Sequence, residues 1–151
     1  MVNTDKISDH LDGSGSKKER DFIRWMMREN ADVAKELKSF FQAANSWKAR
    51  SACVYYAMPF ARESNDAFEL GIIAVSDKSK IVRERACQLL AYSLRTDALP
   101  VLERNSNLEE FSSSLNDYAA AIDAIKCKNS DYFLDRDHSG MVKMIIKPLL
   151  I

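Results

Sequence analysis

Segment 135–140 carries the residue types best suited to binding a cation. Asp135, Asp137 and Ser139 stand at alternate positions, the order in which oxygen ligands open a twelve-residue calcium-binding loop. The twelfth position of such a loop is a bidentate glutamate, and here it is Ile146. The loop thereby loses two oxygens and a charge, so we interpret Asp137 and Ser139 as turn and cap residues and expect no metal site.

Histidine and cysteine offer little else for catalysis. Of the 2 histidines, only His138 lies in the part expected to fold, and no serine or cysteine near it has a nucleophile motif. Cys53, Cys87 and Cys127 form no C-x-x-C pair and lie in apolar, helix-spaced stretches. We expect the three thiols to be buried and the protein to be in a reducing, cytoplasmic compartment. We expect His138 to lie in a surface turn, and we expect no catalytic residue and no cofactor.

Charge suggests binding rather than catalysis. The chain has 22 basic and 22 acidic residues, so nothing favours long-range attraction to nucleic acid or anionic lipid. Residues 97–137 nevertheless hold nine acidic and four basic residues. An acidic patch on a helical scaffold is what an inhibitor of a basic protein presents. The candidate partner-binding acids are Glu109, Glu110, Asp117 and Asp123.

Aromatic residues supply candidate anchors for a partner protein. Trp25 lies off the apolar stripe of its helix, which makes it the best candidate for an exposed anchor. Trp47 and Arg50 are the other candidates from this part of the chain, and Tyr55, Tyr56 and Tyr92 are further aromatic options.

The elements that must position these residues are helices. The chain has 151 residues, 46% hydrophobic and 29% charged, with only 4 Gly and 3 Pro, and no apolar run approaches the ~20 residues of a membrane span. We expect a flexible lead-in over 1–15 and one all-α domain over 16–151.

Cap residues and apolar spacing place these helices. The cap candidates are Ser16, Asn30 and Asp32, Asn45 and Ser46, and Asp77 and Ser79. Each group precedes a stretch with apolar residues at every third or fourth position, and we expect Pro59 to kink or end the third stretch. The pattern also predicts a short helix around Pro100, a long helix over 108–125 with one narrow apolar seam, and a last helix from Ser139–Met141 to Pro148.

Two internal matches indicate a repeat. Residues 50–57 align with 84–91, so that Ala52 matches Ala86 at an offset of 34 residues, and 77–83 aligns with 137–143. The pattern D-x-S-x-[IM]-V-[RK], followed by a small residue and a leucine pair, resembles a HEAT-type repeat, best over 77–104.

The HEAT resemblance implies stacked antiparallel helix pairs in a short solenoid; an irregular helical bundle is the alternative. It also implies that Asp77 binds free N–H groups at a helix start and that Arg83 bonds to an aspartate of the next turn. Some DNA glycosylases for alkylated bases are built from HEAT-like pairs and carry a Trp and an Arg close together on a helix, and Trp47 and Arg50 are similar over those few residues.

Our functional hypothesis is a non-enzymatic protein-binding module. An immunity-type inhibitor that neutralises a basic partner, such as a toxic nuclease, is one form of it. The alternative is a HEAT-like DNA-binding or glycosylase-like repair protein, which the neutral charge disfavours because duplex binding needs several phosphate contacts. A homodimer through the 108–125 seam or the apolar C-terminus is a further option, and we expect no membrane contact.

Overall fold

The computed structural model describes residues 10–29 and 31–147, and within these ranges its regular structure is entirely helical, which confirms the all-α prediction. The α-helices are α2 (Lys17–Arg28), α3 (Val33–Ala43), α4 (Trp47–Ala57), α5 (Asn65–Ala74), α6 (Lys80–Ser93), α7 (Leu99–Ser106) and α8 (Leu115–Lys126). Short 3₁₀ segments are η1 (Met58–Phe60), η2 (Thr96–Ala98), η3 (Glu109–Ser114) and η4 (Ser130–Phe133).

The first helices begin where the cap residues predict. Ser16, Asp32 and Ser46 precede α2, α3 and α4, and each side chain accepts a hydrogen bond from a backbone N–H of the first turn. α4 ends at Ala57, just before Pro59, which cannot donate the next helical hydrogen bond.

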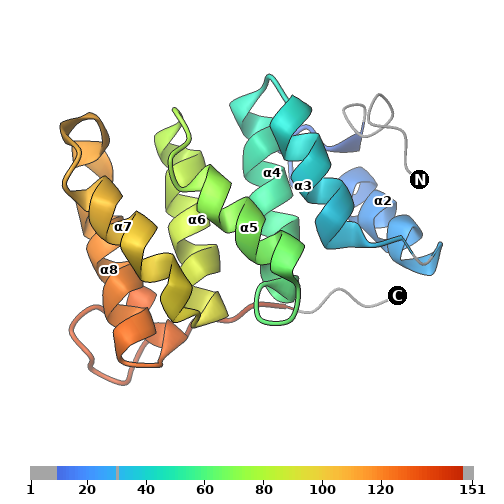
Figure 1. Ribbon diagram of the computed structural model, residues 1–151. Helices are drawn as coiled ribbons and strands as arrows, with labels where there is room; N and C mark the ends of the chain where they lie inside the picture. The colour runs from blue at the N-terminus through green and yellow to red at the C-terminus, as the bar shows by residue number, and fades with distance from the viewer. Residues whose placement is uncertain (1–9, 30, 148–151) are drawn as a thin grey trace.

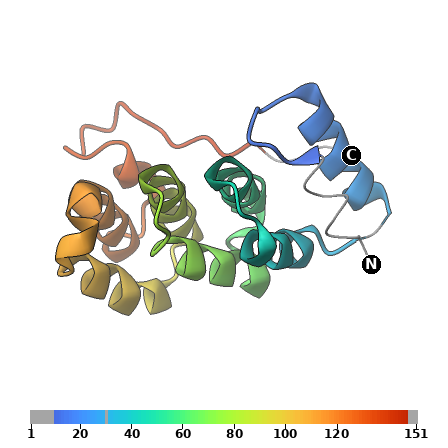
Figure 2. The same cartoon turned by 90° about the horizontal axis from the view of Figure 1, so that it is seen from above.

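Six of the helices form two layers (Figures 1 and 2). One layer contains α3, α5 and α7, and the other contains α4, α6 and α8. Short connections join α3 to α4, α5 to α6 and α7 to α8, as in antiparallel neighbours. α6 lies in the middle and contacts α4, α5 and α8. Residues 134–147 cross the outer face of the α4–α6–α8 layer towards α2 (Figure 2).

Two arginines repeat the same contact in successive helix pairs. Arg50 of α4 and Arg83 of α6 each donate to a backbone carbonyl six residues earlier, that of Ala44 at 3.3 Å and that of Asp77 at 2.8 Å. Their N-cap serines, Ser46 and Ser79, are 33 residues apart. α4 and α6 are therefore equivalent at an offset of 33 residues, one residue fewer than the 34 of the sequence alignment.

Asp77 connects these two helix pairs. Its carboxylate accepts hydrogen bonds from Arg50 Nε at 2.9 Å and Nη2 at 3.3 Å, and from the backbone N–H of Ser79 at 3.0 Å. The predicted contact of Asp77 with a helix start is thus confirmed. The predicted aspartate partner of Arg83 is wrong, because its guanidinium donates instead to the hydroxyls of Ser113 and Ser114.

The long helix predicted over 108–125 is broken in the structure. Phe111 has non-helical backbone angles within η3, and α8 begins only at Leu115. Leu108 and Leu115, two residues of the predicted seam, are exposed, whereas Tyr118 is fully buried and donates its hydroxyl to the carbonyl of Val75. The predicted seam is therefore correct only in its second half.

The predicted last helix is absent from the described residues. Residues 141–147 have no regular structure, and the predicted end at Pro148 lies outside the described part. The side chain of Asp131 accepts a hydrogen bond from the backbone N–H of Met144. In a helix this N–H would have bonded to a backbone carbonyl of the same helix.

Part of the predicted lead-in is packed. Residues 1–9 lie outside the described part, but Leu11 is fully buried and the backbone N–H groups of Gly13 and Gly15 donate to buried Glu19. Among the described helices none is long and apolar enough to span a bilayer.

Candidate functional site

The loop after η4 is closed by one carboxylate. Asp135 is buried and accepts hydrogen bonds from Ser139 N at 3.0 Å, Ser139 Oγ at 2.7 Å and Gly140 N at 2.7 Å. The bonds from Ser139 and Gly140 hold the pKa of Asp135 below its usual value, and the Ser139 hydroxyl contributes most. Both oxygens face protein donors, so this turn has the closed geometry of a capped loop and not the open oxygen ring of a calcium loop.

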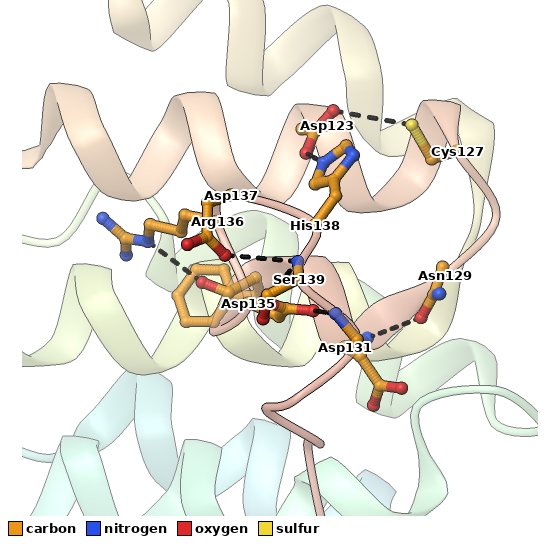
Figure 3. A network of polar contacts seen from close by, with 11 residues as sticks. Asp123, Cys127, Asn129, Asp131, Asp135, Arg136, Asp137, His138 and Ser139 are labelled. Carbon is orange, nitrogen blue, oxygen red and sulfur yellow. Dashed lines mark hydrogen bonds and ion pairs between the residues drawn. The ribbon is translucent and has the colours of Figure 1, made fainter.

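This closed loop presents His138 to α8 (Figure 3). The imidazole stacks on Tyr132, with ring centroids 3.7 Å apart and planes 9° apart, and its Nε2 lies 2.5 Å from Asp123 Oδ2. The backbone of His138 has φ of 56°, a left-handed conformation that non-glycine residues rarely adopt.

Asp123, Cys127 and His138 form what we call the Asp–Cys–His cluster. Asp123 is on α8 and Cys127 is its C-cap residue, one turn later, and the Cys127 thiol donates to Asp123 Oδ1 at 3.5 Å. The prediction of three buried thiols is wrong for Cys127, which is exposed because it follows the last turn of the helix. One ligand atom from each of the three side chains lies within 4.8 Å of the others. No sequence pattern predicts this grouping, because His138 reaches α8 only through the turn of the loop.

The arrangement of the three side chains does not suit Cys127 as a nucleophile. The aspartate stands between the thiol and the imidazole, whereas a base must contact the thiol directly to take its proton. Reduced hydration and the hydrogen bond to Asp123 also raise the pKa of the Cys127 thiol. The three side chains are better arranged to bind a common ligand.

A second feature is a hollow of about 440 Å³ on the outer face of the α4–α6–α8 layer, beside α2. We call it the tyrosine groove. Tyr56 is buried in its floor, and burial raises the pKa of its hydroxyl to about 12, so the ring is neutral. The residues that line the groove, Tyr56 included, are Arg20, Arg24, Tyr55, Tyr56, Met58, Pro59, Gln88, Ile145, Ile146 and Lys147.

The tyrosine groove combines apolar walls with a basic rim. Tyr55 is 52% exposed and packs against Tyr56 edge to face. The guanidinium of Arg85 lies 5.0 Å from the Tyr55 ring centroid, and a smaller hollow that Tyr55 and Arg85 both line adjoins the groove. Arg20, Arg24 and Lys147 line the groove itself, and no acidic side chain from residues 10–29 or 31–147 does.

The predicted partner-binding residues are scattered over the structure. Trp25 and Trp47 are 44% and 41% exposed, but neither lines the groove. Arg50 is buried in its ion pair with Asp77, so its guanidinium does not reach the surface.

The predicted acidic residues also occupy separate places. Glu109 and Glu110 are exposed on η3. Asp117 is paired with Arg136 at 3.0 Å, and Asp123 belongs to the Asp–Cys–His cluster. Of the aromatic residues named from the sequence, Tyr55 and Tyr56 alone line the tyrosine groove.

Comparisons with models of known families, with curated proteins and with solved structures returned no match.

Proposed function

We propose that this protein is a protein-binding module that captures an acidic, partly apolar segment of a partner protein in the tyrosine groove. The observation that carries the proposal is the combination of an exposed tyrosine, apolar walls and a basic rim in one hollow. Exposed aromatic residues beside arginines are the side chains that contribute most at protein interfaces.

The sign of the rim charge determines the partner's chemistry. Arg20, Arg24 and Lys147 line the groove and favour carboxylates on the docked segment, and the walls favour apolar side chains between those carboxylates. Arg85 lies in the adjoining hollow, whose lining also includes the buried Glu19. An immunity-type inhibitor of a basic nuclease would need an acidic face instead. The proposal therefore replaces the basic partner expected from the sequence with an acidic one.

The alternative function, DNA binding with a glycosylase-like site, has less support. It assigns lesion contact to Trp47 and Arg50, and the Arg50 guanidinium is already bonded to Asp77 and to the carbonyls of Ala44 and Asn45. Removing it from that pair would leave a buried carboxylate without its partner.

The proposal is tested by selecting ligands from a random-peptide display library with the full-length protein as bait. We expect enriched peptides that combine acidic with apolar or aromatic residues, and binding that weakens as salt screens the rim. The variant Tyr55→Ala/Arg85→Ser should bind the selected peptides at least about tenfold more weakly.

A matched control uses the other tyrosine–arginine pair of the molecule. The Arg62 guanidinium lies 4.1 Å from the Tyr92 ring centroid, away from the groove. The variant Tyr92→Ala/Arg62→Ser should therefore leave peptide binding unchanged. Enrichment of no peptide, equal loss in both variants, or tighter binding of a DNA oligonucleotide than of any peptide at physiological salt would contradict the proposal.

A further inference from the structure

We propose that Asp123, Cys127 and His138 form a binding site for a zinc ion. The site is separate from the tyrosine groove and does not depend on the function proposed for it. It rests on three donor atoms of three kinds, a carboxylate oxygen, a thiol sulfur and an imidazole nitrogen, within 4.8 Å of one another.

Two of these donors are placed by α8. Asp123 is on the helix and Cys127 is its C-cap residue, four positions later and with right-handed helical backbone angles, so both side chains project from the same face. The thiol already contacts the carboxylate at 3.5 Å. Zinc bonds of about 2.0–2.3 Å in a tetrahedral site place ligand atoms about 3.3–3.8 Å apart, so small side-chain rotations are enough to complete the site.

The third donor is held in place by its surroundings. Tyr132 fixes the plane of the His138 ring by stacking, and the loop that carries His138 is closed by the three hydrogen bonds to Asp135. Outer contacts that orient a histidine are a general feature of metal sites. His138 has a left-handed backbone, and its ring lies towards Asp123 of α8 (Figure 3).

The donor set selects the metal. Calcium and magnesium take oxygen ligands almost exclusively, whereas a thiolate and an imidazole suit zinc. Zinc binding releases the Cys127 proton to solvent. The thiolate and the carboxylate then balance the two positive charges of the ion, and His138 remains neutral.

A hollow of about 550 Å³ lies beside two of the three proposed ligand side chains, Asp123 and His138. Asn116, Tyr132 and Arg136 are among the residues that line it, together with Asp123 and His138. A water molecule is the fourth ligand in this arrangement, as in zinc sites with three protein ligands. The bound ion would fasten the loop after η4 to α8, because its ligands come from both.

Cobalt(II) is the probe for this site, because a thiolate–cobalt bond gives a charge-transfer band in the near ultraviolet. The full chain is prepared without a histidine tag, freed of metal with a chelator, and titrated with Co²⁺. We expect one Co²⁺ per chain, the charge-transfer band, and its loss on addition of one equivalent of Zn²⁺. Cys53 and Cys87 are buried, so the band reports on Cys127.

The single variants Asp123→Asn, Cys127→Ser and His138→Gln should each weaken Zn²⁺ binding by about 10–100-fold or more, and Cys127→Ser should abolish the band. His10→Gln, which changes the other histidine, should bind as the wild type does. All four exchange side chains that are at least partly exposed, and circular dichroism checks their fold. Absence of the band, or wild-type affinity in any of the three cluster variants, would overturn the proposal.

Discussion

The α4–α6 framework and the loop after η4 use charged side chains in opposite ways. In the framework, Arg50 and Asp77 are buried side chains from successive helix pairs, and they lock one pair to the next. In the loop, Asp135 binds the backbone N–H of Gly140, and Asp131 of the preceding η4 binds the backbone N–H of Met144. The comparison indicates that polar groups stabilise helix stacking in the framework, whereas in the loop they replace the helical bonds that the segment lacks.

The largest expected difference between the framework and the loop region is in the reactivity of their cysteine thiols. Framework thiols should be almost unreactive, and Cys127 should react fast. Cys53 and Cys87 are in the framework, and burial raises the pKa of both thiols, whereas Cys127 is exposed. At alkaline pH, a chromogenic aromatic disulfide should react with one thiol per folded chain and with three after denaturation. The fast reaction should be missing in Cys127→Ser, and a second fast thiol would contradict the burial of the framework.

The next largest effect is expected for Asp77→Ala. The change leaves the Arg50 guanidinium buried without its counter-ion and frees the N–H of Ser79, so the free energy of unfolding should fall by about 3–5 kcal/mol. Urea unfolding measures this loss. The double variant Arg50→Met/Asp77→Leu should be more stable than Asp77→Ala, because it buries no unpaired charge, and a double variant at least as unstable would contradict this account.

A smaller and local effect is expected for Asp135→Ala in the loop. Hydrogen exchange of the Ser139 and Gly140 amides should accelerate strongly, because both donate to Asp135, while amides in α6 keep their protection. Asp137→Ala is the matched control, since Asp137 accepts only one longer bond, from Ser139 N at 3.2 Å. Equal acceleration in both variants, or loss of protection in α6, would show that the two regions unfold together.

The smallest effect is expected for Asp117→Ala. Its ion pair with Arg136 joins α8 to the loop, but the arginine is 46% exposed, so water screens the pair. The free energy of unfolding should fall by less than about 1 kcal/mol in urea unfolding. A loss close to that of Asp77→Ala would mean that the loop contributes as much to global stability as the framework.

The helical framework was largely predictable because its signals are local. Ser16, Asp32, Ser46 and Pro59 act on the turn in which they stand, so the sequence alone indicates where α2, α3 and α4 begin and where α4 ends. The segment after Ser139 was predicted wrongly because its spacing is also compatible with a helix. Its backbone is instead bonded to Asp131 and Asp135, side chains outside the pattern.

The candidate sites were predictable only as separate residues. Asp123, Cys127 and His138 were each noticed in the sequence, but the first is on α8, the second is the C-cap residue of that helix, and the third is on a loop whose path depends on the turn closed by Asp135. The basic rim of the tyrosine groove was missed for a related reason. Arg20 and Lys147 are far apart along the chain, and both line the groove because the 134–147 segment crosses the helix layer towards α2.

The most direct test of docking in the tyrosine groove is photo-crosslinking with a peptide selected by the full-length protein. Benzoylphenylalanine replaces Tyr55 in one preparation and Ile73, which is exposed on α5 in the other layer, in a second. We expect the peptide to crosslink to the protein substituted at position 55 and not to the one substituted at position 73. Crosslinking at position 73 with none at position 55 would contradict the groove as the binding site.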